Sequence, residues 1–434
     1  MKNYFLFFLL VIILSNCENS KAKIIIPEGK EIYIPKDLKS NDFNSNDSKW
    51  SYHRMVTSEN FVVFWEKGFG DDLNNPPLLE GKPMKVDLNN LIKKLERFYS
   101  LFRNDMKFVR GKSNADKYRM MVMINYSLEG TAYGGDYDGV IGALWVSPNR
   151  IQDEKLNCIA HELGHSFQSQ IICDGQGEAW GGSGFFEMAS QWMLWQVNPE
   201  WITDEKYHWD AFSKLTHKAY LHMDNIYHSP YILEYWSQKN GLSVIADLFI
   251  RGKKNEDPVM TYKTLYNLLQ EDFCDEMFKA SSHLVNMDFK RVFKETRPYS
   301  KRLISKFDSL EDGWLRISSN NIPENYGFNA MELVIPSDRG KVTIDFIGEK
   351  GDVNTDKAGW RYGFVAITDK DESLYGEICK NKVGTTSYTF PKNKTIESLW
   401  FVVMGAPTEH WRNETTSKDA QWPYKIKING TSLK

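Results

Sequence analysis

One short motif, His161-Glu162-Leu163-Gly164-His165, most narrows what this chain can fold into. Two histidines four positions apart lie on one face of an α-helix, because the helix turns once every ~3.6 residues. Their imidazoles can therefore bind a single metal ion, and Glu162, beside the first of them, points toward a metal-bound water. The motif predicts a helix that carries two zinc ligands and a general base.

The residues around the motif favour a helix that is packed into a core. Apolar side chains recur at helical spacing on the opposite face, at Ile159, Leu163, Phe167 and Ile171. The alternative is a buried helix with two core histidines beside a stray carboxylate. A buried carboxylate without a partner is costly, so the metal site is the preferred interpretation.

A third ligand must come from elsewhere, because catalytic zinc usually takes three protein ligands and leaves one position for water. The pattern HExxHxxGxxH is excluded, since Gln168 and Ile171 occupy its glycine and third-histidine positions. We expect Glu187, which begins a predicted helix after a glycine-rich loop that lets the chain double back. Glu178, inside that loop, is the alternative.

Four further side chains are candidates to assist the metal ligands. Gln191 follows Glu187 by one helical turn, and its carbonyl oxygen is expected to accept a hydrogen bond from a metal-bound histidine. Gln168 is expected either to touch substrate or to be buried and satisfied by backbone. His228 and Tyr231 lie at the start of a predicted helix and are the candidates to stabilise an oxyanion during catalysis. An ordinary core or surface position is the alternative for both.

The beginning of the chain has the features of an export signal. Lys2 precedes an apolar run over residues 4–14, which is shorter than the ~20 residues that span a bilayer and suits a signal peptide. The run ends in Leu-Ser-Asn-Cys, which is similar to a bacterial lipobox, so Cys17 is expected to carry a lipid. A plain cleaved signal is the alternative. We expect an exported protein, held at the outer membrane or cell surface through that lipid alone.

The order of predicted elements indicates an α+β protein. The elements before the motif are, in order, strand 58–68, helix 88–103, strand 117–126, a glycine-rich turn over 130–139 and strand 140–148. The segment from 200 to about 298 has helical spacing. We expect strand 140–147 at the edge of a sheet, where a peptide substrate can add as an extra strand. An ordinary internal strand is the alternative.

Composition divides the chain into four parts. Residues 1–16 form the predicted signal peptide, and residues 17–56, rich in Asn, Asp, Ser and Lys, predict a tether. Residues 57–299 form the predicted catalytic domain. Residues 300–434 alternate short apolar runs with turns, which predicts an all-β sandwich. Its tryptophans are expected to form a carbohydrate-stacking face or to pack in cores: Trp314, Trp360, Trp400, Trp411 and Trp422.

Charge and cysteine content exclude some classes of protein. The formal net charge of −3 argues against a nucleic-acid partner. The cysteines after Cys17 are scattered and form no CxxC pair, which excludes a disulfide framework and a zinc-finger set. For these cysteines, the alternatives are one disulfide bridge in an oxidising compartment or buried thiols. We expect a monomer that acts on a protein or glycoprotein.

Several longer segments carry a resemblance to known proteins: SENFVVFWEKGFG, TAYGG, IGALWVSP, AHELGHSFQ, GFFEMASQWMLW, YGFNAMELVIP, WRYGFVA, LWFVVMGAP and QWPYKIKI. Together they resemble a family of uncharacterised secreted bacterial proteins, many of them Bacteroidetes lipoproteins. The resemblance covers roughly residues 50–434 and implies a zincin-like domain with a zinc site and a β-sandwich tail. HELGHxxQ with Glu187 is also similar to enhancin-like, mucin-cleaving metallopeptidases. Gln191 stands where thermolysin-like enzymes have the aspartate of ExxxD, which is a departure from that pattern.

The sequence therefore predicts a zinc metallopeptidase of the glutamate-ligand zincin type. Zn²⁺ is the expected cofactor, with His161, His165 and Glu187 as ligands and Glu162 as the general base. One alternative is a non-catalytic surface lipoprotein that binds glycan or peptide on a zincin scaffold. Another is metal-dependent hydrolysis of a bond that is not a peptide bond.

Overall fold

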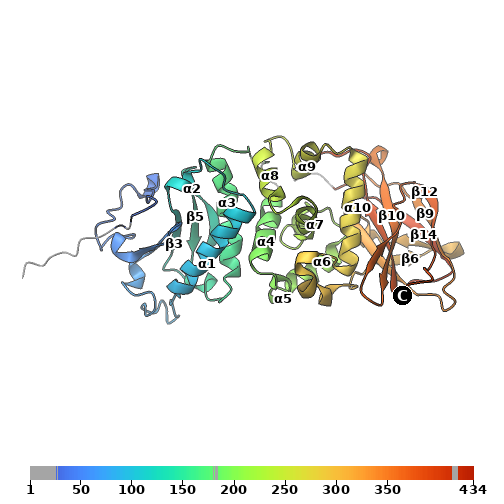
Figure 1. The fold of residues 1–434 in the computed structure, drawn as a ribbon, viewed down its shortest axis with the longest axis horizontal. Helices are drawn as coiled ribbons and strands as arrows, with labels where there is room; N and C mark the ends of the chain where they lie inside the picture. The colour runs from blue at the N-terminus through green and yellow to red at the C-terminus, as the bar shows by residue number, and fades with distance from the viewer. Residues whose placement is uncertain (1–25, 27, 179, 181–183, 413–418) are drawn as a thin grey trace, which may run out of the picture.

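The structure, a computed structural model, describes residues 26, 28–178, 180, 184–412 and 419–434. The predicted signal peptide and the predicted lipidation at Cys17 lie outside the described residues. The fold is mixed α+β, as expected. Figure 1 shows a sheet with its helices at one end of the long axis, a helical middle, and two further sheets at the C-terminal end.

The N-terminal sheet has five strands in the order β1-β2-β3-β5-β4. Their bounds are β1 Met55–Thr57, β2 Phe61–Trp65, β3 Met120–Ile124, β4 Ala132–Tyr137 and β5 Ile141–Val146. Strands β2, β3 and β5 run parallel, and β2 and β3 are buried along their whole length, as is typical of strands covered on both faces. Strand β4 is antiparallel to β5 and ends the sheet.

The edge of this sheet is not the predicted one. Strand β5, predicted to lie at the edge, is internal, between β3 and β4. The segment 130–139, predicted as a turn, contains the edge strand β4. Its glycines mark a close approach of two backbones, because an added Cβ on Gly134 would lie 1.8 Å from the carbonyl oxygen of Glu162. A glycine-rich pattern suggested a turn, whereas the glycine is needed for contact with the neighbouring helix.

Helices cover the sheet and then continue as the middle of the molecule. Helix α1 (Leu88–Ser100) begins at Asp87, whose side chain accepts a hydrogen bond from the Asn90 N–H, and it buries Leu91, Leu95 and Phe98. The others are α2 Asn114–Lys117, α3 Asn157–Cys173, α4 Phe185–Val197, α5 Trp201–Asp204, α6 Tyr207–Leu215, α7 Tyr231–Asn240, α8 Val244–Arg251, α9 Pro258–Tyr266, α10 Gln270–Asn286 and α11 Phe293–Thr296. The helical segment predicted after residue 200 is confirmed.

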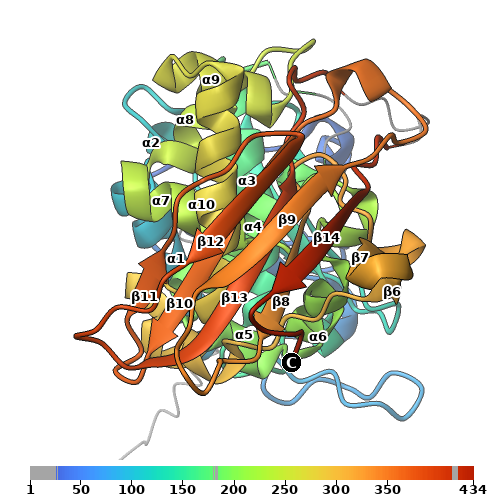
Figure 2. The same cartoon turned by 90° about the vertical axis from the view of Figure 1, so that its right-hand side faces the viewer.

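The C-terminal part consists of two antiparallel sheets, of strand order β11-β10-β13-β8 and β12-β9-β14-β7-β6. Their bounds are β6 Phe307–Ser309, β7 Trp314–Ile317, β8 Phe328–Leu333, β9 Val342–Gly348, β10 Trp360–Thr368, β11 Ser373–Tyr375, β12 Val383–Tyr388, β13 Ile396–Gly405 and β14 Tyr424–Asn429. Figure 2 shows the five-stranded sheet toward the viewer, with the helices behind. Phe346 and Tyr424 of one sheet share a core with Tyr362 and Phe401 of the other.

Most of the tryptophans in the C-terminal part are packing residues. Trp360, Trp400 and Trp422 are at most 2% exposed, so they cannot present a stacking face to a carbohydrate. Trp314 and Trp411 are half-buried, and each has a lysine ammonium over its ring. The core-packing alternative therefore holds for the three buried rings.

The predicted tether over 17–56 is wrong for residues 28–56. Phe43 and Trp50 are buried in the core under the N-terminal sheet. Arg54 is also buried, and its guanidinium donates hydrogen bonds to backbone carbonyl groups of the loop formed by Asn46, Ser48 and Lys49. A polar segment can thus pack when a few aromatic side chains are buried and one buried donor satisfies its backbone carbonyl groups.

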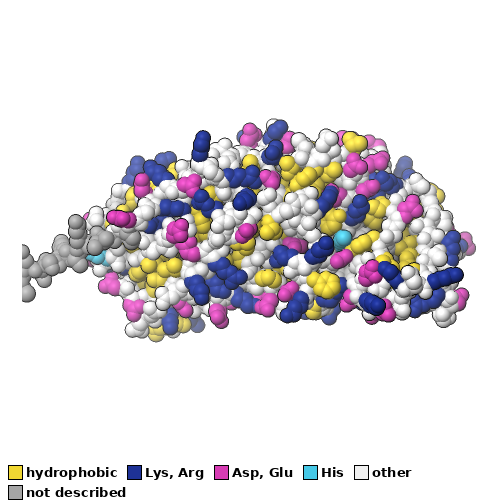
Figure 3. All heavy atoms as spheres, in the orientation of Figure 1, with side chains coloured by type: hydrophobic (Ala, Val, Ile, Leu, Met, Phe, Trp, Pro, Cys, Tyr) yellow, Lys and Arg dark blue, Asp and Glu magenta, His cyan; other side chains and the backbone are white. Residues whose placement is uncertain are grey.

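One hydrophobic core continues from the helical middle into the C-terminal part. Val365, Trp400 and Met404 of the four-stranded sheet belong to the same core as the helices, and α10 packs against β10 and β13. Among the described residues, no helix combines the length and apolarity needed to cross a bilayer. Figure 3 shows acidic and basic side chains interspersed over the face in view.

Candidate metal centre

Helix α3 presents the motif on a partly exposed strip. His161, Glu162 and His165 are each partly exposed, whereas the opposite face is buried, as the spacing predicts. The buried face consists of Ile159, Leu163, Phe167 and Ile171. The two imidazoles and the carboxylate therefore face away from the core and toward solvent.

Helix α4 brings the third candidate ligand to the same place. Gly164 of α3 packs directly on Ser190 of α4, where an added Cβ would lie 2.4 Å from the Ser190 hydroxyl oxygen. The Ser190 hydroxyl donates a hydrogen bond to the carbonyl oxygen of His161. This close contact sets the distance between the helices, so that Glu187, in the first turn of α4, reaches both imidazoles.

Three donor atoms form a nearly equilateral triangle. Glu187 Oε2 lies 3.1 Å from His161 Nε2 and 3.1 Å from His165 Nε2, and the two nitrogens are 3.2 Å apart. Ligand atoms on a tetrahedral zinc ion with bonds of about 2.0–2.1 Å are separated by about 3.3 Å. When both imidazoles carry their proton on Nδ1, these three atoms are all acceptors that face one point, and a cation satisfies them together. The residues present therefore fit a three-ligand zinc site.

Without a metal ion, the charged groups at this centre shift the pKa of one another. Burial raises the pKa of Glu187, but hydrogen bonds from His161 and His165 outweigh that effect and hold the pKa of the carboxylate well below its usual range. Burial lowers the pKa of His165, and its hydrogen bond and attraction to Glu187 outweigh burial and leave that pKa raised. The carboxylate is thus ionised at neutral pH, as a metal ligand must be.

Two glutamine side chains orient the two imidazoles. His161 Nδ1 lies 3.1 Å from Gln191 Oε1, as predicted for Gln191. His165 Nδ1 lies 3.0 Å from Gln168 Oε1, and the Gln168 amide donates to the carbonyl oxygen of Phe186. An Nδ1–H donated to an amide oxygen leaves Nε2 free for a metal. Gln168 is buried and its amide nitrogen is satisfied by backbone, which is one of the two predicted alternatives. Its contact with His165 was not predicted, although its position three residues later on the same helix indicates that the two side chains are neighbours.

The edge strand holds the carboxylate of Glu162. The backbone N–H of Gly134 in β4 donates to Glu162 Oε2 at 2.8 Å. This hydrogen bond occupies one carboxylate oxygen and leaves the other available to a reacting group. Because β4 and α3 are in direct contact, the position of the carboxylate depends on the edge strand as well as on its own helix.

Tyr227 also belongs to this site and was not among the predicted site residues. Its ring stacks on the ring of His161, with centroids 6.2 Å apart and planes inclined by 28°. Burial, followed by the charge of Glu187 and a hydrogen bond to it, raises the pKa of Tyr227 to about 12. The side chain is nevertheless 42% exposed, so a substrate can reach it. The only sequence signal was its place in a tyrosine-rich stretch beside His228.

Tyr231, His228 and Glu178 are the remaining candidate residues, and the structure gives each of them its own surroundings. Tyr231 is 1% exposed and packs among Trp195, Trp209 and Phe212, so its predicted contact with an oxyanion is wrong. The helical spacing that suggested it directs this side chain into the core.

His228 and Glu178 have other partners among the described residues. His228 Nδ1 is 2.7 Å from His208 Nδ1, and His208 rather than His228 contacts Gln191. Glu178 is exposed and accepts a hydrogen bond from the Lys254 N–H, so it is not positioned as the third ligand.

A second cluster of ligand-type side chains, His222, Glu324 and Asp419, lies elsewhere in the described residues. It fits a metal less well. Glu324 is already paired with the Lys218 ammonium and the Ala219 N–H. His222 Nδ1 accepts the Asp224 N–H, which places the imidazole proton on Nε2, the nitrogen that faces Asp419.

Comparison with known proteins gives the family. The model of a family of unknown function, DUF6055, matches residues 25–434. The chain belongs to this family. No curated protein matches this DUF6055 chain.

Two solved structures resemble the DUF6055 chain weakly. The catalytic module of the metalloprotease ZmpA from Clostridium perfringens aligns with a TM-score of 0.31 and 10% identity, over 87% of this chain and 68% of that one. The M60 catalytic domain of ZmpB from the same organism, solved with its CBM51-1 and CBM51-2 domains, aligns with a TM-score of 0.29 and 10% identity, over 89% of this chain and 60% of that one. Alignments this weak do not establish a shared function.

Proposed function

We propose that this DUF6055 protein is a zinc-dependent peptidase whose metal is held by His161, His165 and Glu187. The observation that supports this best is the triangle of donor atoms, with edges of 3.1–3.2 Å, beside the carboxylate of Glu162. A site that only binds a ligand needs no base next to its metal. The presence of Glu162 therefore favours hydrolysis.

The side chains at the site have separate tasks in this reaction. Zinc bound there would supply a water with a pKa of about 7 and polarise a scissile carbonyl group. Glu162, held at Oε2 by the Gly134 N–H, takes the proton of the attacking water at its other oxygen and passes it to the leaving amine. Tyr227, with a pKa of about 12, stays protonated and donates a hydrogen bond to the carbonyl oxygen as it becomes an oxyanion.

The substrate is proposed to bind along strand β4. This strand pairs with β5 on one side and is the last strand of the described sheet, so its other edge has no strand partner there. A peptide bound there passes beside Glu162, because Gly134 of β4 contacts that carboxylate directly. The proposed site of strand addition is therefore Ala132–Tyr137, whereas residues 140–147 were predicted from the sequence.

Location, domain roles and partners remain proposals that the sequence motivates. We propose an exported protein that is anchored through Cys17 at the outer membrane or cell surface, after removal of residues 1–16. It acts as a monomer on proteins or glycoproteins, as the resemblance of HELGHxxQ to mucin-cleaving enzymes suggests. Residues 57–299 carry the chemistry, and residues 300–434 are the zincin-associated β-sandwich.

The test compares wild type with Glu162→Gln and with Glu178→Gln, an exposed carboxylate outside the site. Metal analysis is followed by cleavage profiling on a peptide library and on glycoproteins, with and without chelator. We expect about one zinc ion per chain in all three proteins. Chelator-sensitive cleavage should fall by about 10²–10⁴-fold in Glu162→Gln alone. Zinc binding with no cleavage of any substrate would support the binding protein instead, and equal turnover in Glu162→Gln would overturn the mechanism.

A further inference from the structure

A chain of short contacts runs from the candidate metal ligand into the protein. His161 Nδ1 lies 3.1 Å from Gln191 Oε1, and Gln191 Nε2 lies 3.0 Å from His208 Nε2. His208 Nδ1 in turn lies 2.7 Å from Nδ1 of His228. Gln191 and His208 are buried, at 3% and 5% exposure, whereas His228 is partly exposed. These contacts therefore link the candidate metal centre to the surface through two buried polar side chains.

In each of these contacts, the donor and the acceptor can be assigned in one consistent way. A histidine that offers Nε2 to a metal carries its proton on Nδ1, which then donates to the oxygen of Gln191. This fixes the amide of Gln191, whose nitrogen donates to the Tyr227 carbonyl oxygen at 3.1 Å and to His208 Nε2. His208 Nε2 must then be an acceptor, so its proton lies on Nδ1 and is donated to His228 Nδ1.

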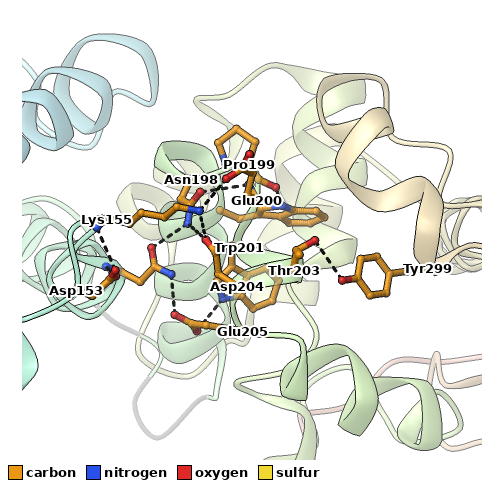
Figure 4. A network of polar contacts seen from close by, with 12 residues as sticks. Asp153, Lys155, Asn198, Pro199, Glu200, Trp201, Thr203, Asp204, Glu205 and Tyr299 are labelled. Atoms are coloured by element: carbon orange, nitrogen blue, oxygen red, sulfur yellow. Dashed lines mark hydrogen bonds and ion pairs between the residues drawn. The ribbon is translucent and has the colours of Figure 1, made fainter.

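A carboxylate competes for the same nitrogen of His208. Glu205 Oε2 lies 3.3 Å from His208 Nε2 and would bind a proton placed there. That carboxylate already accepts hydrogen bonds from Trp201 Nε1 and Asn157 Nδ2, as part of the network in Figure 4. The contact of His208 Nε2 with Gln191 Nε2 is the shorter of the two, at 3.0 Å against 3.3 Å for Glu205 Oε2, and it requires that this nitrogen accept rather than donate.

We propose that His208 is a positioning residue for the metal centre, held by His228 in the tautomer that carries its proton on Nδ1. In this form His208 accepts from Gln191 and keeps the Gln191 oxygen turned toward His161. The same amide holds the backbone of Tyr227, so one histidine sets both a ligand and the proposed oxyanion donor. This inference rests on the proposed zinc site.

The direct test is the protonation pattern of the histidines. Protein labelled with ¹⁵N-histidine is studied at about pH 7.5 by long-range ¹H–¹⁵N correlation, without metal and with zinc, and assigned with His208→Phe and His228→Phe. We expect the Nδ1–H form for His208 and the Nε2–H form for His228 in both samples. A proton on Nε2 of His208, or on both nitrogens, would mean that Glu205 and not Gln191 is its partner, and the proposal would be overturned.

Zinc affinity, measured by competition with a chelator, tests the consequence. We expect His208→Phe to bind zinc about 10-fold more weakly than wild type, and His228→Phe to show a smaller loss. Glu200→Gln is the control, because Glu200 lies in the same network but pairs with Lys155. Unchanged affinity in a folded His208→Phe protein would reject the positioning role. Failure of wild type to bind zinc would reject the proposed function, while the metal-free spectra would still decide the tautomer of His208.

Discussion

The reactive side chains of the site are held by different kinds of partner. Amide oxygens of Gln191 and Gln168 orient His161 and His165, whereas a backbone N–H of the edge strand orients Glu162. A side-chain partner can be removed by one substitution, but a backbone partner can be lost only if the strand moves. At the scale of single residues, substitution can therefore test the side chains at the site one by one, including the ligands and Tyr227.

Replacement of Tyr227 by phenylalanine tests its proposed catalytic role. The variant keeps the ring on His161 and loses the hydroxyl that donates to the oxyanion. We expect kcat to fall by about 10²–10³-fold with zinc affinity preserved, measured on a substrate found by cleavage profiling. Tyr207→Phe is the control, because Tyr207 is also exposed and its hydroxyl faces Glu205. A normal kcat in Tyr227→Phe would exclude the hydroxyl from the reaction.

The affinity for zinc should depend on pH in a defined direction. Zinc requires neutral imidazoles, and the pKa of His165 is raised above 6.5 in the folded protein. Protons therefore compete as pH falls through that raised pKa, and the affinity is lost on the acid side. We expect about tenfold weaker binding per pH unit for each proton displaced, measured by chelator competition between about pH 5.5 and 8. An affinity independent of pH would contradict ligation by this histidine.

The same interaction has the opposite effect on the metal-free fold. A raised folded-state pKa means that the contact of His165⁺ with Glu187 stabilises the protein below the pKa of the unfolded chain and is lost as pH rises through the folded-state pKa. The melting temperature of metal-free protein should therefore fall as pH rises, over the same range in which the zinc affinity increases. If the melting temperature and the zinc affinity both increased with pH, another titratable group would control the stability of the metal-free protein.

At the scale of elements, the centre depends on how closely α3 and α4 pack and on the contact of α3 with β4. Gly164 permits the first contact and Gly134 the second, since an added Cβ would meet Ser190 Oγ at 2.4 Å or the Glu162 carbonyl oxygen at 1.8 Å. Both glycines act through the space they leave, and neither has a positive φ angle. The helices and the edge strand thus meet at the two glycines that flank the reactive side chains.

Replacement of Gly164 by alanine should separate the two helices. We expect a loss of about 1–3 kcal/mol in the free energy of unfolding, from overpacking against Ser190. Zinc affinity should fall about tenfold or more, because Glu187 would move relative to the imidazoles and ligand distances tolerate only about 0.2 Å. Chemical denaturation and chelator competition measure the two effects. Gly111→Ala, where an added Cβ meets nothing within 4 Å, should change neither.

At the scale of the whole molecule, the parts of the chain share a core. The four-stranded sheet contributes Val365, Trp400 and Met404 to the core that also holds the helices. Arg361 of that sheet is buried and ion-paired with Asp275 of α10. The predicted boundary near residue 300 is thus a change from helices to strands, and the hydrophobic core crosses it.

This shared core predicts cooperative unfolding. We expect calorimetry to show one thermal transition for the whole protein. Chelation should lower its midpoint, because free zinc at 100 times its Kd stabilises the folded state by about 2.7 kcal/mol. Two separate transitions, with only one sensitive to chelator, would instead show that the C-terminal sheets unfold independently.

The sequence by itself determined the features that depend on local spacing. Helical periodicity is enough to place His161 and His165 together and to predict the partnership of Gln191 with the same centre, because residues three or four apart share a helix face. Glu187 could be chosen because it begins the next helix after a glycine-rich loop. These inferences needed no knowledge of how distant segments pack.

Only the tertiary structure decided the rest. The edge strand β4, the hold of Gly134 on Glu162, the ring of Tyr227 over His161 and the packing of residues 28–56 all join segments that are far apart in the chain. Local composition read 130–139 as a turn and 17–56 as a tether, since glycine and polar residues are typical of both. The physical reason is that a contact between distant segments depends on the space between packed elements, which no short-range pattern records.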